Sequence, residues 1–270
     1  MTLVMGIVNV TPDSFSDGGR YLDAEAAIAH GRALRAAGAD LLDVGGESTR
    51  PGAQRIDPLR ESERVLPVIA ALAGDGAIVS VDTMNASTAI AAVDAGARIV
   101  NDVSGGLADP GMLAAVAASG ADVVLQHWRG PSDDMYAQAE YGDVEAELAA
   151  ELEERMAAAG RAGISPDRVI LDPGIGFGKR GDQNWQTLRG LERIVAIGPR
   201  VLVGTSRKRF LAELLATGVP AEVTEARRDL ATAVTSVLAA RAGAWAVRVH
   251  DVAATRDALA VARAWERGGA

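Results

Sequence analysis

The sequence predicts an α/β protein in which eight strand–helix units close into a barrel. Three observations predict it. Short apolar runs recur along the chain, segments of helical composition lie between them, and most runs end in a polar residue. Eight such units in about 250 residues fit a (β/α)8 TIM barrel. The alternative is an open doubly wound sheet, but no Gly-x-Gly-x-x-Gly follows the first strand.

Length, composition and charge narrow the class of protein. The 270 residues are 49% hydrophobic, contain no Cys and carry a formal net charge of −9. Without Cys there is no disulfide framework, thiolate metal site or thiol nucleophile. The negative charge argues against nucleic acid as a partner. No apolar run approaches the roughly 18 residues that span a bilayer, so we expect no membrane partner and a cytoplasmic protein. No linker divides the chain, so we expect a single domain over residues 1–270.

The opening stretch, Met5–Gly19, begins as a buried strand and ends as a polar loop. Its apolar run reaches Val10, and Pro12 stops the strand. Asn9 lies at the end of the strand, and Asp17 lies in the loop beyond it. Barrels of this class present their chemistry at the carboxyl ends of their strands, so this stretch is the first candidate for a site.

The following elements repeat this order of strand, polar end and helix. A helix is expected from Ala24 to Ala37, a strand over Ala39–Val44, and a charged helix from Asp57 to Ala73. Long helices are expected near Val144–Gly160 and Glu225–Arg241. The eight expected strands end near Asn9, Asp43, Asp82, Asn101, Gln126, Asp172, Gly204 and Arg248.

A weak internal repeat supports the same organisation. The pattern Gly-Ala-x-apolar-apolar occurs four times, and each time we expect a helix to end on the glycine and a strand to follow at once. The four glycines are Gly38, Gly96, Gly120 and Gly243. The repeat is a βα unit whose strand ends in a polar residue.

Polar residues at the strand ends form the candidate site, because the carboxyl ends of barrel strands meet on one face. A single Asp or Asn in such a position often only satisfies loop backbone groups. A full set of polar strand ends indicates a functional site instead. The set comprises Asn9, Asp43, Asp82, Asn101, His127, Asp172, Ser206, Lys208, Arg248 and His250.

Asp82, Asn101 and Asp172 form a group rich in hydrogen-bond acceptors. Buried carboxylates beside an amide suit a flat heterocycle with several N–H donors, such as an aminopyrimidine ring, because a wrong ligand would leave buried polar groups unpaired. Metal ligation is the alternative, although the sequence lacks a His–carboxylate spacing for a tight transition-metal site. Asn9 or a carboxylate could hold Mg²⁺ through substrate phosphates.

A cationic group lies at the ends of strands seven and eight, where TIM barrels often bind phosphate. It comprises Ser206, Lys208, Arg248 and His250. Arg248 and His250 are two residues apart, so their side chains lie on one side of a strand. We expect Lys208 and Arg248 to contact an anion or a ring. We expect Arg207 and Arg209 to form a solvated, basic start of a helix.

The segment Asp172–Lys179 is a stiff, glycine-rich exit from the sixth strand. Its glycines let a ligand approach the backbone closely. The segment lacks the Gly-Lys-Ser/Thr ending of a P-loop, which disfavours nucleotide binding.

Seven segments, in order along the chain, resemble those of the dihydropteroate synthases, the folate-pathway enzymes that sulfonamides inhibit. The resemblance covers essentially the whole chain, and seven segments in order are specific where one alone would not be. The segments are Met5–Gly19, Asp43–Gly52, Ser80–Thr83, Asn101–Gly105, Asp172–Lys179, Gly204–Lys208 and Arg248–Asp251.

The resemblance implies a transferase that joins 6-hydroxymethyl-7,8-dihydropterin diphosphate to p-aminobenzoate, with Mg²⁺, and releases 7,8-dihydropteroate and diphosphate. It also implies an SN1-like route through a pterin cation, and a homodimer. Asn9, Arg248 and His250 resemble the contacts to diphosphate, with Asn9 also at the metal. The residues that resemble the pterin contacts are Asp82, Asn101, Asp172, Lys208 and Arg248.

The resemblance further implies two mobile loops, after strands 1 and 2, that close over p-aminobenzoate. The residues in question are Phe15, Asp17, Thr49, Arg50 and Pro51, and Ser206 belongs to the same pocket. The expected catalytic residues are Asp172, Asp82, Lys208 and Asp17. Either Asp82 or Asp172 suits stabilisation of a pterin cation, and we favour Asp172. Asp17 would aid the cation or the closure of the loop.

Three other functions are weighed against this one. A non-catalytic pterin- or phosphate-binding relative would show losses in Ser206–Lys208, Thr49–Pro51 or the opening loop, and all three are intact. The pterin-binding methyl-transfer module of corrinoid enzymes expels no diphosphate, so Ser206–Lys208 and Thr49–Pro51 argue against it. A Schiff-base aldolase would place Lys208 in an apolar setting that lowers its pKa, and the sequence does not decide this.

Overall fold

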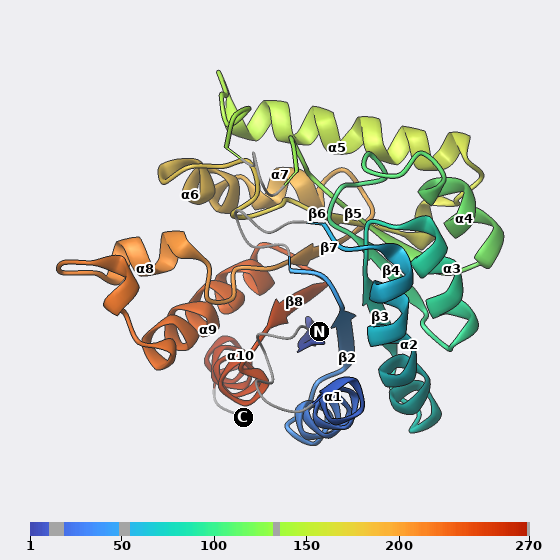
Figure 1. Ribbon diagram of the computed structural model, residues 1–270. Helices are drawn as coiled ribbons and strands as arrows, with labels where there is room; N and C mark the ends of the chain where they lie inside the picture. Colours follow the sequence, from blue (N-terminus) through green and yellow to red (C-terminus); the bar gives the residue numbers. More distant parts are fainter. Residues whose placement is uncertain (11–18, 49–54, 132–135, 269–270) are drawn as a thin grey trace.

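The computed structural model describes residues 1–10, 19–48, 55–131 and 136–268. Its strands are β1 (Leu3–Asn9), β2 (Leu41–Gly45), β3 (Val79–Asp82), β4 (Ile99–Asp102), β5 (Asp122–Gln126), β6 (Val169–Asp172), β7 (Arg200–Val203) and β8 (Ala246–Val249). They are parallel and close into a barrel in chain order (Figure 1). β1 pairs with both β2 and β8, so the sheet has no open edge. The predicted (β/α)8 TIM barrel is confirmed.

Helices lie between the strands and surround the barrel (Figure 1). They are α1 (Gly19–Ala36), α2 (Pro58–Gly74), α3 (Ala86–Asp94), α4 (Met112–Ser119), α5 (Val144–Arg161), α6 (Asp182–Arg189), α7 (Leu191–Val195), α8 (Arg209–Leu215), α9 (Glu225–Arg241) and α10 (Val252–Glu266), with short 3-10 turns η3 (Pro166–Arg168) and η4 (Pro220–Glu222). None of the described helices is long and apolar enough to cross a lipid bilayer.

The helix boundaries follow local capping signals. The helix expected at Glu225–Arg241 has those bounds. Asp57 caps α2 by accepting the Leu59 N–H at 2.9 Å, and Pro58 opens the helix because its missing N–H is not needed there. α1 begins at Gly19 rather than at Ala24, since residues 20–23 contain no Gly or Pro that would delay the helix.

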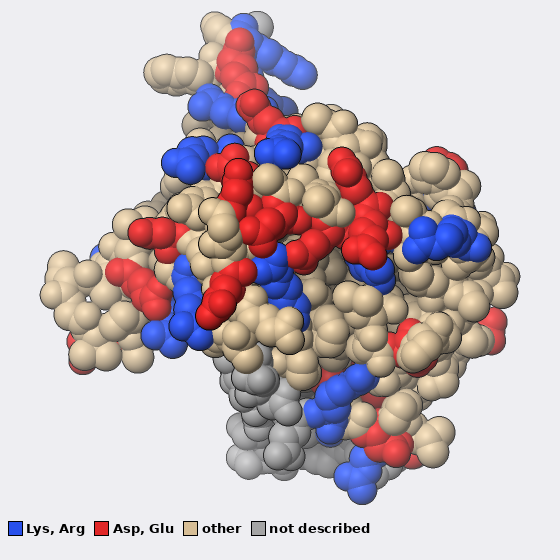
Figure 2. Space-filling model, turned by 90° about the horizontal axis from the view of Figure 1, so that it is seen from above, with Lys and Arg blue, Asp and Glu red and all other residues tan. Residues whose placement is uncertain are grey.

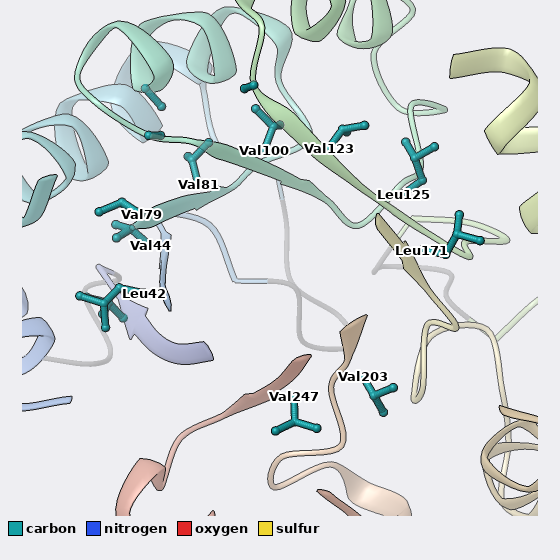
Figure 3. Close-up of a cluster of buried hydrophobic side chains, with 14 of the residues drawn as sticks. Leu42, Val44, Val79, Val81, Val100, Val123, Leu125, Leu171, Val203 and Val247 are labelled. Atoms are coloured by element: carbon teal, nitrogen blue, oxygen red, sulfur yellow. The ribbon is translucent and has the colours of Figure 1, made fainter. Parts of the chain in front are cut away.

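The core has two parts, one on each side of the barrel wall. Outward-facing strand residues such as Leu42, Val100 and Leu171 pack beneath the helices (Figure 3). A smaller cluster lies inside the barrel, and it comprises Met5, Leu41, Ile99, Val124, Ile170, Leu202 and Ala246. Strand side chains alternate between the two faces, so Asp172 lies on the same inner side as Ile170. The apolar cluster therefore fills the interior below the polar strand ends.

The four glycines of the Gly-Ala repeat all have a positive φ. The values are 99° at Gly38, 113° at Gly96, 76° at Gly120 and 95° at Gly243. This left-handed conformation ends α1, α3, α4 and α9 and turns the chain into the next strand. A side chain would be strained at each of these positions, which explains why the repeat begins with glycine.

Replacing Ile170 with Ala should lower the free energy of unfolding by about 2–5 kcal/mol, because the change leaves a cavity in the inner cluster. Ile90→Ala is the matched control, since Ile90 on α3 is 46% exposed. It should change the free energy of unfolding by about 0.5 kcal/mol or less. Urea unfolding followed by circular dichroism measures both. Equal losses would show that the inner cluster contributes no more than the surface.

Candidate active site

Four strands deliver buried polar side chains to the carboxyl end of the barrel. Asp43 lies on β2, Asp82 ends β3, Asn101 lies on β4 and Asp172 ends β6. All four are 8% exposed or less. Asp82 and Asn101 are partners in the β3–β4 register, so they lie side by side at the barrel mouth. The strand order thus places the predicted acceptor group at one end of the barrel.

Arg248 joins this group from β8 by pairing with two carboxylates at once. Its Nε lies 2.6 Å from Oδ2 of Asp43, and its Nη2 lies 2.8 Å from Oδ2 of Asp82. Asn101 donates from Nδ2 to the same Asp43 oxygen at 3.0 Å. Arg248 was expected to contact an anion or a ring. In the structure, Asp43 and Asp82 already pair with Nε and Nη2 of its guanidinium, and Nη1 lies outside these two ion pairs.

Two buried acceptor atoms in this group have no hydrogen-bond partner among the described residues. They are Oδ1 of Asp43 and Oδ1 of Asn101. A buried acceptor without a donor is costly, so it requires a partner from a ligand or from solvent. The mouth of the barrel is therefore built to receive N–H or O–H donors.

Burial raises the pKa of Asp82 and Asp172, the two expected catalytic carboxylates that the structure describes. For Asp82, burial is the main cause and the nearby charge of Asp43 adds to it, whereas Arg248 opposes it, and the pKa rises to about 7. For Asp172, burial raises the pKa while the positive charge of Lys208 opposes the rise. Asp82 therefore exchanges its proton close to neutral pH.

The turn after β6 connects Asp172 to Lys208. Oδ1 of Asp172 accepts the Gly174 N–H at 2.7 Å, and Lys208 donates from Nζ to the carbonyl of Ile175. The Lys208 ammonium also lies 4.8 Å from the ring centre of Phe177. Gly174 has a φ of 63°, and a Cβ there would lie 2.3 Å from the carbonyl oxygen of His127. Only glycine fits this position.

Lys208 was also considered as a Schiff-base lysine. Burial lowers its pKa to about 8, although the charge of Asp172 opposes the shift. Its ammonium is engaged by a carbonyl oxygen and faces a carboxylate, which is a setting for a hydrogen-bonding cation rather than for a neutral amine.

Ser206 and His250 form a direct pair beside this turn. Oγ of Ser206 lies 2.8 Å from Nδ1 of His250, and it accepts the His250 N–H at 3.0 Å. The sequence placed both residues in one cationic group, although the resemblance implied different ligands for them, and the structure shows that they are in direct contact.

Arg207 shapes the segment between Ser206 and Lys208. It has a φ of 56°, a left-handed conformation that costs a non-glycine residue about 1–2 kcal/mol. Its guanidinium pairs with Asp229 of α9 at 2.7 and 2.8 Å. The expectation of a solvated Arg207 is therefore wrong, because a carboxylate of α9 holds it. Arg209 is solvated as expected, with a side chain that is 78% exposed.

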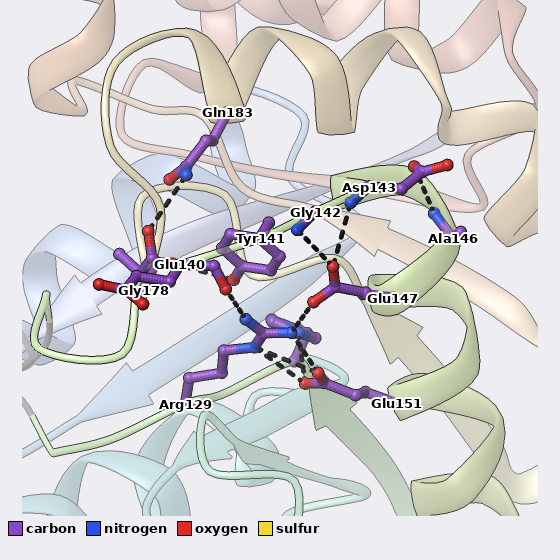
Figure 4. Close-up of polar contacts among 12 residues, drawn as sticks. Arg129, Glu140, Tyr141, Gly142, Asp143, Ala146, Glu147, Glu151, Gly178 and Gln183 are labelled. Atoms are coloured by element: carbon purple, nitrogen blue, oxygen red, sulfur yellow. Dashed lines mark hydrogen bonds and ion pairs between the residues drawn. The ribbon is translucent and has the colours of Figure 1, made fainter.

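His127 lies at the end of β5 but its ring turns away from the carboxylates at the barrel mouth. It is 2% exposed, with Nδ1 3.0 Å from Nζ of Lys179 and Nε2 2.9 Å from Glu151. Glu151 and Glu147, both on α5, bind Arg129, and Arg129 also lies over the ring of Tyr141 (Figure 4). Sequence patterns did not point to Lys179 or Glu151 as partners of His127.

Asn9 ends β1 beside Gly45 of β2, half-buried at the barrel mouth. No three described His, Asp or Glu side chains lie together in a way that would hold a metal ion. The p-aminobenzoate and loop predictions fall largely on segments outside the described residues. They are Phe15, Asp17, Thr49, Arg50 and Pro51.

Acidic side chains gather on the face that Figure 2 shows, which looks down on α5. They lie across the middle of this face, with Lys and Arg beside them. The α5 sequence contributes Glu145, Glu147 and Glu151 from its first half. This distribution agrees with the formal net charge of −9.

Two grooves, of about 540 and 600 Å³, lie at the opposite end of the barrel, between helix ends and strand starts. The first is lined mainly by small residues, with Arg98 as its charged member. Neither includes a residue of the polar strand ends. The amino-terminal face of such barrels contributes stability rather than chemistry, so the site is placed at the other end.

Comparison with known proteins gives consistent findings. The model of a family described as pterin binding enzymes matches residues 5–250. A dihydropteroate synthase of Mycobacterium leprae (strain TN) is 52% identical over 267 residues, which is 98% of this chain and 94% of the relative. The Xanthomonas albilineans dihydropteroate synthase solved with 4-aminobenzoic acid is 47% identical, with a TM-score of 0.89 and coverage of 98% and 93%. Its complex with 7,8-dihydropteroate is 45% identical, with a TM-score of 0.86 and coverage of 98% and 94%.

The pKa of Asp82 should respond in opposite directions to its two neighbours. Asp43→Asn should lower it, because a like charge disappears. Arg248→Met should raise it further, because the attracting cation disappears. Carbon NMR titration of the Asp side chains in wild type and both variants measures the shifts. Shifts of the same sign in both variants would contradict the charge arrangement described above.

Proposed function

The chain belongs to the pterin binding enzyme family, and we propose that the mouth of its barrel is a dihydropteroate synthase active site with the roles given below. The function is that of a transferase that condenses 6-hydroxymethyl-7,8-dihydropterin diphosphate with p-aminobenzoate to give 7,8-dihydropteroate and diphosphate. The observation that carries the assignment of residues is the group of buried acceptors beside two cations at the strand ends.

The pterin ring is proposed to bind against Asp82, Asn101 and Asp172. A pterin presents several N–H donors on one edge, and these three side chains offer carboxylate and amide oxygens in a buried setting. The unpartnered Oδ1 of Asn101 supports this role, because a ring N–H would satisfy it. Lys208 and Arg248 are proposed to lie beside the ring. Arg248 is held there by its ion pair with Asp82.

The diphosphate is proposed to lie over the ends of β1 and β8, against Asn9, His250 and the Nη1 side of Arg248. Asp43 and Asp82 pair with Nε and Nη2 of Arg248, so Nη1 is the donor group proposed to meet the diphosphate. The Ser206 hydroxyl positions His250 for the same contact. Cations placed where negative charge develops favour departure of the leaving group.

Mg²⁺ is proposed as the metal, and its fit to this chain rests on the type of donor present. Asn9 supplies one amide oxygen, and no described set of three carboxylates or imidazoles forms a separate cage. Such a donor set suits Mg²⁺, which is usually bound by one or two protein oxygens together with substrate phosphates and waters. When bound, Mg²⁺ would neutralise the charge that develops on the diphosphate.

The proposed route is SN1-like. The bond between the pterin methylene carbon and the diphosphate oxygen breaks first, and the diphosphate leaves with the bonding electrons. The carboxylate of Asp172 stabilises the pterin cation that forms, with Asp82 as the second anion of the site. The amine of p-aminobenzoate then bonds to the methylene carbon and gives up a proton to water. Ser206 is the described residue of the proposed p-aminobenzoate pocket.

The active protein is proposed to be a cytoplasmic homodimer. An exposed apolar stripe on α9 supports the dimer, since Leu230, Val234 and Leu238 are 67%, 53% and 56% exposed and follow each other at helical spacing. α9 packs against α10 (Figure 1). Arg241 of α9 pairs with Glu266 of α10 at 2.9 Å. A second copy of this chain would cover the stripe. The absence of Cys is compatible with a reducing compartment.

The wild-type protein should release diphosphate when it is mixed with both substrates and Mg²⁺, and EDTA should stop the release. Asp172→Asn should lower kcat by about 10²–10³-fold, because it removes the anion opposite the pterin cation. Asp167→Asn, an exposed change at the other end of β6, is the control and should leave kcat unchanged. A coupled diphosphate assay measures all three proteins. Near-normal turnover by Asp172→Asn would remove its proposed role, and no release by wild type would contradict the function.

Val234→Arg should convert the dimer to monomers, because an arginine in the middle of the α9 stripe would be buried without a partner. Ile90→Arg is the control, since Ile90 is comparably exposed but lies on α3. Sedimentation velocity gives the mass of each protein. A dimer that persists in Val234→Arg, or a monomeric wild type, would exclude this interface.

A further inference from the structure

Lys179 is the largest fully buried side chain in the described part of the chain, at 1% exposed. Its ammonium has three N–H donors, and three acceptors surround it. They are the carbonyl of Gly174 at 3.0 Å, the carbonyl of Phe177 at 3.1 Å and Nδ1 of His127 at 3.0 Å. Each donor therefore has one acceptor, which offsets part of the cost of burying the ammonium.

His127 acts as the third acceptor for Lys179 in one tautomer of its imidazole ring. Because Nδ1 accepts from Lys179, the neutral ring carries its proton on Nε2, which lies 2.9 Å from Oε2 of Glu151. Nε2 nevertheless makes no hydrogen bond among the described residues. Burial and the positive charge of Lys179 lower the pKa of His127 to about 4, so the ring stays neutral at ordinary pH. Arg129 pairs with Glu151 and anchors the far end of the chain of contacts (Figure 4).

The carbonyls that Lys179 binds belong to the turn that positions the proposed pterin contacts. Gly174 offers its carbonyl to Lys179 and its N–H to Oδ1 of Asp172 at 2.7 Å. The same turn closes through the Phe177 N–H and the Gly174 carbonyl at 3.0 Å. Between these two residues lies Ile175, whose carbonyl accepts from Lys208. One turn therefore sets the place of both Asp172 and Lys208, and Lys179 holds it from behind.

The charges of Lys179 and Asp172 also link these two residues. Burial lowers the pKa of Lys179 to about 7, and the charge of Asp172 is the largest effect opposing that shift. The positive charge of Lys179 in turn opposes the rise in the pKa of Asp172. Three cations, Lys208, Lys179 and Arg248, thus act on this carboxylate, and of the two lysines only Lys208 is exposed enough to meet a ligand.

We propose that Lys179 is a positioning residue for pterin binding: by holding the carbonyls of Gly174 and Phe177 and Nδ1 of His127, it fixes the turn that aims Asp172 and Lys208 at the ring. Lys179 itself touches no substrate. The inference rests on the proposed function, because it assigns Asp172 and Lys208 to the pterin. It predicts an effect on the pterin substrate that is not shared by p-aminobenzoate, whose proposed contacts do not include this turn.

Lys179→Met tests the role directly, because methionine fills a similar volume without donors. Calorimetry with 6-hydroxymethyl-7,8-dihydropterin diphosphate and Mg²⁺ should show a Kd at least about 10-fold weaker than that of wild type. The KM for p-aminobenzoate at saturating pterin should stay within about 2-fold of wild type. Met112→Ala is the control, since Met112 is fully buried on α4. It should lower the unfolding midpoint without changing the Kd.

A pair of His127 variants separates the Lys179 contact from the Glu151 contact. The amide oxygen of His127→Asn lies in the place of Nδ1, two bonds beyond Cβ, and can still accept from Lys179. His127→Leu cannot. Both variants lose the contact to Glu151, so a weaker Kd in His127→Leu alone would show that the acceptor for Lys179 matters. Equal Kd values in the two variants would overturn that part of the proposal.

The outcomes distinguish the positioning role of Lys179 from the proposed function of the protein. If wild type and Lys179→Met bind the pterin diphosphate equally, or if Met112→Ala weakens binding as much, the positioning role is wrong and the proposed function stands. If wild type does not bind the pterin diphosphate, both are wrong. Weaker pterin binding in Lys179→Met, with an unchanged KM for p-aminobenzoate, supports the positioning role.

Discussion

Arg248 is held between two buried carboxylates, Asp43 and Asp82, and much of the barrel mouth depends on that arrangement. An unpaired buried carboxylate costs several kcal/mol, so three of them at one end of a barrel require cations close by. Arg248 serves two, and Lys208 and Lys179 act on Asp172. The pairing cannot be local, because Arg248 and Asp43 are 205 residues apart. Only closure of β8 onto β1, next to β2, brings them into contact.

Much of the fold could be predicted from the sequence because its signals are local. Apolar runs marked the strands, the Gly-Ala repeat marked helix ends that need a left-handed residue, and the strand ends at Asn9, Asp82 and Asp172 were located correctly. The start of α1 was less well placed, since nothing at residues 20–23 forces a boundary. The candidate site followed from topology: polar strand ends of a closed parallel barrel must lie on one face.

The partners of the site residues could not be predicted in the same way. Ser206 with His250, Arg207 with Asp229, and His127 with Lys179 are contacts between elements distant in sequence, and they depend on register and on side-chain direction. A basic residue before a helix usually lies in solvent, so Arg207 gave no sign of its partner. The sequence contained one local sign for Lys179, which is its position at the end of the glycine-rich segment Asp172–Lys179. Glycines in such a turn indicate that other groups lie close to the backbone.

The same charge balance explains how the proposed site would bind both a ring and an anion. Buried acceptors such as Oδ1 of Asn101 remain costly until a donor reaches them, so a ring with matching N–H groups gains affinity that an apolar or mismatched ring does not. Arg248 and Lys208, which offset Asp43, Asp82 and Asp172, are partly buried, and in the proposed site Arg248 faces the departing diphosphate. Removing the carboxylates would leave these partly buried cations without partners, and removing the cations would push the carboxylates toward their neutral forms. In the proposed site, binding of the ring and departure of the anion therefore rely on one set of ion pairs, so a change to the carboxylates also affects the cations.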